Sequence, residues 1–151
     1  AINAPLAGEM SGHIFIKDKF YGFDDALYVG IRVLCQMAKT GKSITDFIDR
    51  LPPLHATPEL RIDCPDDAKF DVMQQIANNV SMRTASKNVT LIDGVRVRIN
   101  DGWWLLRASN TEDALVARAE GKTPAILAKL VKDIEAALAT AGLKWTCPKQ
   151  G

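Results

Sequence analysis

The sequence predicts an α+β fold in two parts, a partial α/β domain over residues 1–52 and a β-α-β-β-β-α domain over residues 53–151. The second part is expected to place two helices on a four-stranded antiparallel sheet. Three observations support this division. Apolar residues recur at helical spacing in three long segments, Asp-Gly pairs join short apolar stretches, and Pro52-Pro53 ends the helical part of the first half. With 151 residues, 47% of them hydrophobic, the chain is long enough to bury a core.

The first part is expected to contain one strand and two helices. A glycine-bounded loop, Gly8–His13, leads into the apolar strand Ile14–Ile16. A helix then begins near Asp24 and ends at Gly41, and a shorter helix begins at Ser43, where Asp46 supplies an acidic version of the capping box. The apolar stripe of the longer helix consists of Leu27, Ile31, Leu34 and Ala38.

The second part is expected to begin with a strand and a helix and to continue as a meander. Asp93-Gly94 and Asp101-Gly102 are turn sequences, because aspartate and glycine suit the backbone of tight hairpins. The expected segments are the strand Glu59–Cys64, the helix Asp66–Asn79 and the strands Val89–Ile92, Val95–Ile99, Trp103–Arg107 and Ala114–Glu120.

A long helix is expected to complete the second part. Thr123 is placed to cap it and Pro124 to begin it, and Gly142 follows its last turn. One face of this helix is apolar, which predicts that it packs on the sheet. The residues of that face are Leu127, Leu130, Val131, Ile134 and Leu138.

Composition excludes several classes of function. Nineteen Lys and Arg against 18 Asp and Glu give a formal charge of +1, so the chain has no broad electrostatic field for nucleic acid or an anionic membrane. No segment approaches the roughly 20 apolar residues of a membrane span, and no secretion signal precedes the first strand. Cys35, Cys64 and Cys147 form neither a pair motif nor a disulfide framework. We therefore expect reduced thiols and a cytoplasmic protein.

The segment Gly8–His13 is the first candidate site. In an extended loop alternate residues face the same side, so Glu9, Ser11 and His13 would together present an acceptor, a hydroxyl and a titratable ring. Such a set suits neighbouring hydroxyls of a sugar. The alternative is a turn whose polar groups satisfy its own backbone.

The segment Arg107–Thr111, between two expected strands, is the second candidate. Arg107 offers a planar fork for two phosphate oxygens, Ser109 and Thr111 can donate through their hydroxyls, and Asn110 adds an amide. Backbone amides of the turn can complete an anion site. The alternative is an ordinary β-turn, in which these residue types are common.

Three other features, Trp103-Trp104, His55 and Cys64, are expected to be structural. Trp103-Trp104 could stack nucleic-acid bases, but adjacent strand residues point to opposite faces, so one tryptophan is expected in the core. His55 has no neighbouring ligand cluster at metal spacing. Cys64 is expected to be a small buried hydrophobe rather than a nucleophile.

Taken together, the two candidate loops resemble the α-D-phosphohexomutase superfamily, specifically its bacterial phosphomannomutase/phosphoglucomutases. Gly8–His13 is similar to the family's sugar-binding loop, and Phe20–Asp25 to the segment that follows it. Thr57–Glu59, Asp93–Arg96 and Arg107–Glu112 occur in the family's order. The resemblance covers nearly the whole chain.

The resemblance implies a C-terminal fragment of a four-domain enzyme. Residues 1–52 would be the end of the third domain and residues 53–151 the fourth, with a topology like that of the TATA-binding protein. A start at Ala1 without methionine favours the interpretation that the sequence is a piece cut from a longer chain. The phosphoserine loop and the magnesium loop of the family are not found, so no catalytic residue and no metal ligand is expected here. Mg²⁺ would be bound elsewhere in the full-length enzyme.

The resemblance also implies what the loops do. The family moves phosphate between the 1- and 6-positions of a hexose through a bisphosphate intermediate. Glu9 and Ser11 would bind sugar hydroxyls, with His13 beside them, while Arg107 and the set Ser109, Asn110 and Thr111 would bind the phosphate that is not transferred. The fragment alone would be inactive. Its expected partners are hexose phosphates and the remaining mutase domains, with no nucleic acid and no membrane.

One departure and two alternatives qualify this resemblance. Asp113 stands where the family usually has proline, which removes a fixed φ and adds a negative charge near the phosphate loop. A phosphoglucosamine mutase fragment is the nearest enzymatic alternative, although Met10 in the sugar loop favours the mannose/glucose branch. A free-standing phosphosugar-binding module is an alternative of another class.

Overall fold

The chain divides into two compact units. They comprise Ala1–Pro52 and Pro53–Gly151, and the computed structural model describes residues 3–9 and 11–147. Met10 lies outside the described residues. The combination of helices with antiparallel sheets confirms the predicted α+β class.

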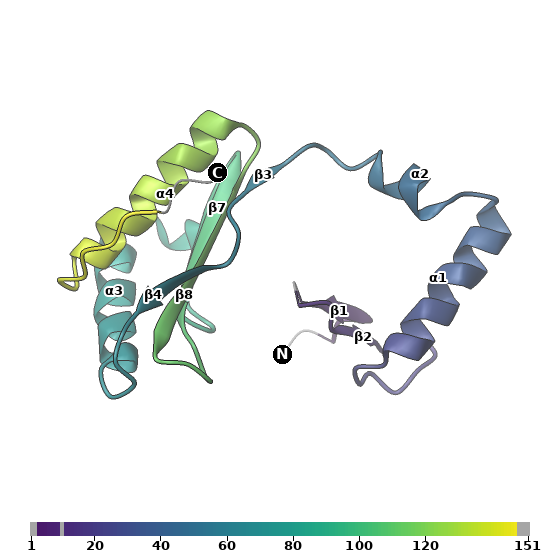
Figure 1. The fold of residues 1–151 in the computed structure, drawn as a ribbon, viewed down its shortest axis with the longest axis horizontal. Helices are drawn as coiled ribbons and strands as arrows, with labels where there is room; N and C mark the ends of the chain where they lie inside the picture. Colours follow the sequence, from purple (N-terminus) through teal and green to yellow (C-terminus); the bar gives the residue numbers. More distant parts are fainter. Residues whose placement is uncertain (1–2, 10, 148–151) are drawn as a thin grey trace. The chain divides into compact units, whose positions relative to one another are not determined.

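Unit 1 contains a small hairpin and two helices (Figure 1). Strand β1 (Leu6–Gly8) pairs antiparallel with β2 (Ile14–Ile16), and helices α1 (Ala26–Thr40) and α2 (Ile44–Ile48) follow. The sequence did not predict β1. Its three residues are too short to show a period, and pairing of Ala7 with Phe15 establishes the strand.

The two helices of unit 1 begin and end at the expected kinds of residue. The Asp25 side chain caps α1 by accepting a hydrogen bond from the Tyr28 N–H at 2.8 Å. Gly41 ends it with φ of 63°, a left-handed conformation that favours glycine. Ser43 and Asp46 form the reciprocal capping box of α2, as the sequence predicts.

Unit 2 is built on an antiparallel sheet that, in the described residues, has six strands. Its strands run in the order β3-β8-β7-β6-β5, and β4 also pairs with β8. Two helices and a 3-10 turn complete it (Figure 1). The bounds are β3 (His55–Ala56), β4 (Leu60–Asp63), α3 (Lys69–Arg83), η1 (Ser86–Asn88), β5 (Val89–Thr90), β6 (Val95–Ile99), β7 (Gly102–Ala108), β8 (Ala114–Gly121) and α4 (Pro124–Ala139).

The observed order has two strands more than β-α-β-β-β-α, and one helix begins at a different residue. Strand β3 was not predicted, and β5, the beginning of the expected segment Val89–Ile92, is additional to the strands in that order. Helix α3 begins three residues later than expected, because the Pro65 carbonyl accepts from the N–H groups of both Ala68 and Lys69 in a tight turn.

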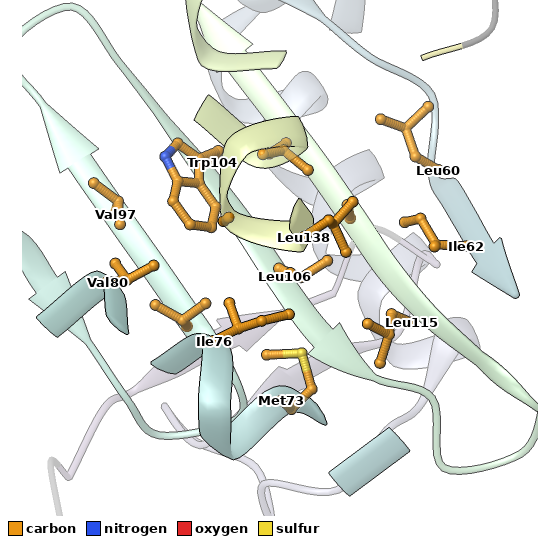
Figure 2. Packing of buried hydrophobic residues seen from close by; sticks show 14 of the residues in the cluster. Leu60, Ile62, Met73, Ile76, Val80, Val97, Trp104, Leu106, Leu115 and Leu138 are labelled. Carbon is orange, nitrogen blue, oxygen red and sulfur yellow. The ribbon is translucent and has the colours of Figure 1, made fainter. Parts of the chain in front are cut away.

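The core lies between the sheet and helices α3 and α4, which pack on the same face (Figure 2). Ile76 of α3, Leu106 of β7 and Leu138 of α4 are fully buried. Trp104 is 3% exposed in this cluster, whereas Trp103 contacts the Arg96 guanidinium on the opposite face of the sheet. The expectation that one tryptophan belongs to the core is thus confirmed.

Candidate functional site

The second candidate loop connects β7 to β8 at one end of the sheet. The Ser109 N–H donates to the Ala114 carbonyl at 2.9 Å, which closes the loop, and the Ala114 N–H donates to the Glu112 carbonyl at 2.8 Å. The Cys64 N–H donates to the Asp113 carbonyl at 3.1 Å from the end of β4. Backbone hydrogen bonds therefore fix the loop at several points.

Ser109 organises this loop from inside. It is 6% exposed, and its Oγ accepts from the N–H groups of Thr111 at 3.3 Å and Glu112 at 3.1 Å. In both contacts the hydroxyl oxygen accepts, so neither contact uses the hydroxyl hydrogen. The sequence predicts that backbone amides of the turn can complete an anion site, but the N–H groups of Thr111 and Glu112 donate to Ser109.

Asn110 and Thr111 form the exposed tip of the loop. Within residues 3–9 and 11–147, neither the Asn110 amide nor the Thr111 hydroxyl has a side-chain hydrogen bond to the protein. The structure therefore presents both groups to solvent. They can donate to an anion without breaking a contact within the chain.

Arg107 lies on β7, two residues before Ser109 of the loop. Its guanidinium lies 3.6 Å from the Asp93 carboxylate, on the turn between β5 and β6. Gly94 in that turn has φ of 81°, and a Cβ there would lie 2.3 Å from the Leu106 carbonyl oxygen. Only glycine allows this approach, which brings Asp93 to Arg107.

Two residues that no sequence pattern indicates, Arg61 and Lys69, support the same loop. The Arg61 guanidinium pairs with the carboxylates of Glu112 and Glu59. The buried Lys69 Nζ donates to the Glu112 carbonyl at 3.1 Å. No sequence spacing links these residues to the loop. Only the pairing of β4 with β8 and the position of α3 bring them there.

The first candidate loop is the turn between β1 and β2. The Glu9 N–H donates to the His13 carbonyl at 2.9 Å, and the Gly12 N–H donates to the Glu9 carbonyl at 3.1 Å, with φ of 95° at Gly12. Ser11 Oγ donates to Glu9 Oε2 at 3.1 Å. The loop is thus a tight turn and not extended as the sequence analysis assumed. Glu9 and Ser11 meet because the chain reverses direction, not because alternate residues share a face.

His13 faces Asp24 rather than Glu9 and Ser11. Its Nδ1 lies 2.5 Å from Asp24 Oδ2, and the Ile14 N–H donates to Asp24 Oδ1 at 3.1 Å. This hydrogen bond and the charge of Asp24 raise the pKa of His13. The hydrogen bond with His13, and after it the one from the Ile14 N–H, lowers the pKa of Asp24. The sequence places Asp24 near the start of the helix and in the segment Phe20–Asp25, and neither pattern predicts its contact with His13; the helix cap is Asp25.

The thiol of Cys64 belongs to the core of unit 2. Cys64 is buried, and burial raises the pKa of its thiol, so the expectation of a small buried hydrophobe is confirmed. In the described part of the chain, no group of three or more His, Cys, Asp or Glu is placed to hold a metal ion. The described helices include none long and apolar enough to cross a membrane.

Both units match known protein domains. Residues 1–55 match the family model of phosphoglucomutase/phosphomannomutase alpha/beta/alpha domain III, and residues 59–137 match that of the C-terminal domain of the same family. A solved phosphoglucomutase/phosphomannomutase family protein from Burkholderia thailandensis is 39% identical with a TM-score of 0.77, covering 92% of this chain and 29% of its own.

Curated relatives show the same relationship. A phosphomannomutase/phosphoglucomutase of Pseudomonas putida is 44% identical over 85% of this chain and 27% of its own length. A phosphoglucomutase of Neisseria gonorrhoeae is 38% identical over 89% and 29%, and a phosphoglucosamine mutase of Methanococcus maripaludis is 34% identical over 86% and 28%. The chain thus spans less than a third of the length of these relatives. It belongs to the phosphoglucomutase/phosphomannomutase family, within which it corresponds to domain III and the C-terminal domain.

Proposed function

We propose that this chain is the C-terminal, substrate-binding part of a phosphomannomutase/phosphoglucomutase. The whole enzyme would interconvert hexose 1-phosphate and hexose 6-phosphate through a bisphosphate intermediate. The observation that carries the proposal is the tightly bonded loop that follows Arg107 of β7, with the Asn110 amide and the Thr111 hydroxyl exposed at its tip. Relatives of the same family name support the reaction class.

The phosphate loop supplies fixed donors to an anion. Arg107 would give two parallel N–H donors to phosphate oxygens, and Ser109 and Thr111 would add hydroxyl donors. Asn110 would add its amide. Because backbone hydrogen bonds already order the loop, little conformational entropy remains to be lost on binding. These residues would hold the phosphate that does not react, so that the other end of the hexose is positioned.

The sugar loop would recognise hydroxyl groups. The Glu9 carboxylate accepts from Ser11, and both groups are exposed, so a sugar hydroxyl can replace or extend that contact. His13 would lie beside the sugar, oriented by Asp24. No proton transfer is assigned to it.

The bond-changing groups would belong to parts of the protein outside this chain. A phosphoserine loop and a magnesium loop, which the family resemblance implies, are not found in the sequence. The described residues hold no cluster fit for Mg²⁺, so no step through the metal is attached to this chain. A cytoplasmic location, expected because the sequence spacing of the three cysteines gives neither a pair motif nor a disulfide framework, is part of the same proposal.

Binding without turnover is the test. The 151-residue chain should bind glucose 1-phosphate or mannose 1-phosphate more tightly than glucose, and should form no hexose 6-phosphate in a coupled assay. Turnover by the chain alone would contradict the proposal, as would equal affinity for the unphosphorylated sugar. The phosphoglucosamine mutase of Methanococcus maripaludis supports a phosphoglucosamine mutase as the alternative. Glucosamine 1-phosphate as a third ligand tests it, because tighter binding of this sugar phosphate would favour the alternative.

A further inference from the structure

Lys69 is the buried cation beneath the phosphate loop. It is the first residue of α3, its side chain is 3% exposed, and its ammonium group donates to the Glu112 carbonyl at 3.1 Å. We propose that Lys69 is a positioning residue, which holds the loop Ser109–Asp113 in the shape that binds phosphate. The inference rests on the proposed function for the identity of the ligand.

The ammonium group lies 5.3 Å from the centroid of the neighbouring Phe70 ring and makes two polar contacts that differ in kind. Its ion-pair partner, Asp66, lies three residues earlier on the turn that leads into α3, and that carboxylate is largely exposed. Its other partner, the Glu112 carbonyl, is 43 residues away in the sequence. The first contact balances the charge locally, whereas the second ties the loop to the helix.

Burial of the Lys69 ammonium group destabilises the folded state, so its contact with the Glu112 carbonyl indicates a role for the charge in the loop. Removing an ammonium group from water costs several kcal/mol, and an apolar residue of similar volume often stabilises a fold as well as a buried ion pair does. The core of unit 2 is otherwise apolar around α3, with Met73, Ile76 and Val80 on its buried face. The fold therefore does not require a charge at this position. What the charge adds is a fixed donor to the loop.

Three groups of Glu112 contact other residues of unit 2. Its N–H donates to Ser109 Oγ, its carbonyl accepts from Lys69, and its carboxylate pairs with Arg61. These contacts leave the tip residues Asn110 and Thr111 exposed, and the proposed function assigns both of them to phosphate. Lys69 provides the only one of these contacts that comes from a helix among the described residues.

The test compares Lys69→Met with Val80→Ala in the 151-residue chain. Both change a buried residue of α3, but Val80 has no hydrogen bond to the loop. Two quantities are measured by NMR: amide hydrogen exchange of Thr111 and Glu112 without ligand, and the Kd for glucose 1-phosphate. A hydrogen bond from a charged donor is worth about tenfold or more in an equilibrium constant. Lys69→Met should therefore speed exchange and weaken binding by about tenfold, and Val80→Ala should leave both within about twofold.

A second variant keeps the test decisive if Lys69→Met does not fold. Lys69→Gln removes the charge but keeps an N–H donor, so its exchange rates and Kd should fall between those of the parent and the methionine variant. Unchanged exchange at Thr111 and Glu112 in the folded variants would overturn the inference, and so would equal effects of Lys69→Met and Val80→Ala.

Failure of the proposed function gives a different result. If the parent chain shows no response to glucose 1-phosphate while Lys69→Met still speeds loop exchange, the hold of Lys69 on the loop is supported and the phosphate assignment fails. If the parent binds glucose 1-phosphate and Lys69→Met binds it equally well, the phosphate assignment stands and the positioning role fails.

Discussion

The guanidinium of Arg107 lies 3.6 Å from the carboxylate of Asp93, at the end of the sheet that carries the loop Ser109–Asp113. At this separation the charges attract without forming a hydrogen bond of normal length. Asp93 is two-thirds exposed and Arg107 one-third exposed, so solvent screens the pair. The pair therefore orients Arg107 without occupying its N–H donors, and a phosphate can bind them.

Replacing Arg107 with alanine should weaken binding of glucose 1-phosphate by about tenfold to a hundredfold, because charge-assisted hydrogen bonds are worth about 1.5–3 kcal/mol. Arg107→Lys should recover part of this affinity, since lysine keeps the charge but lacks the planar fork. Calorimetry measures both. Arg98→Ala is the matched control, because Arg98 is an exposed arginine on β6 away from the loop. Equal losses for Arg107→Ala and Arg98→Ala would contradict a specific phosphate site.

The pH dependence of His13 should follow Asp24. The hydrogen bond and charge of Asp24 raise the pKa of His13, so the imidazolium persists to higher pH in the folded chain than in the unfolded chain. The stabilisation that His13 gains is present below its unfolded pKa and is lost as the pH rises through the raised folded value. The pKa of Asp24 is lowered by His13 and the Ile14 N–H, so its contribution is lost as the pH falls through that lowered value.

Asp24→Asn should therefore lower the pKa of His13, as measured by NMR titration of the imidazole ring. Glu9→Gln is the control, because the charge of Glu9 is the smallest of the effects that raise the pKa of His13. Its substitution should lower the pKa less than Asp24→Asn does. A His13 pKa that is the same in the parent and in Asp24→Asn would show that the pair does not form in solution.

Asp113→Pro should strengthen phosphosugar binding several-fold. At about 8 Å and an intermediate dielectric constant of roughly 40, an aspartate repels phosphate by on the order of 1 kcal/mol per unit of phosphate charge. In the described part of the chain the Asp113 N–H has no acceptor, so proline removes no hydrogen bond there. Asp113→Asn separates the charge from the fixed φ and should give most of the gain. Unchanged affinity in both variants would show that the Asp113 charge does not reach the site.

Unit 1 should associate through the apolar face of α1. The helix has no buried residue, and Leu27, Ile31 and Leu34 are 76%, 51% and 64% exposed. Such a contiguous apolar surface favours association in water. Sedimentation should show concentration-dependent association of the 151-residue chain, which substitution of these three residues with serine abolishes. A monomer at every concentration would contradict this expectation.

Local signals in the sequence predicted the elements that local contacts determine. The capping box of Ser43, the cap at Thr123 and the alternation that buries Trp104 are all present in the structure. Strands β1 and β3 escaped prediction because they are too short for a period and depend on partner strands. Lys69 and Arg61 escaped it because long-range packing alone brings them to Glu112. Asp24 was assigned to its helix because sequence proximity hid its contact with His13.

The most direct test of the account is an NMR titration of the labelled 151-residue chain with glucose 1-phosphate, mannose 1-phosphate and inorganic phosphate, repeated on Arg107→Ala. Sugar phosphates should shift the signals of both Glu9–His13 and Arg107–Thr111, and the substitution should abolish the shifts at the second loop. A response of Arg107–Thr111 alone, equal for inorganic phosphate, would support the phosphate loop and contradict the sugar loop. No response at either loop at millimolar ligand would contradict the proposal that this chain carries the substrate-binding residues.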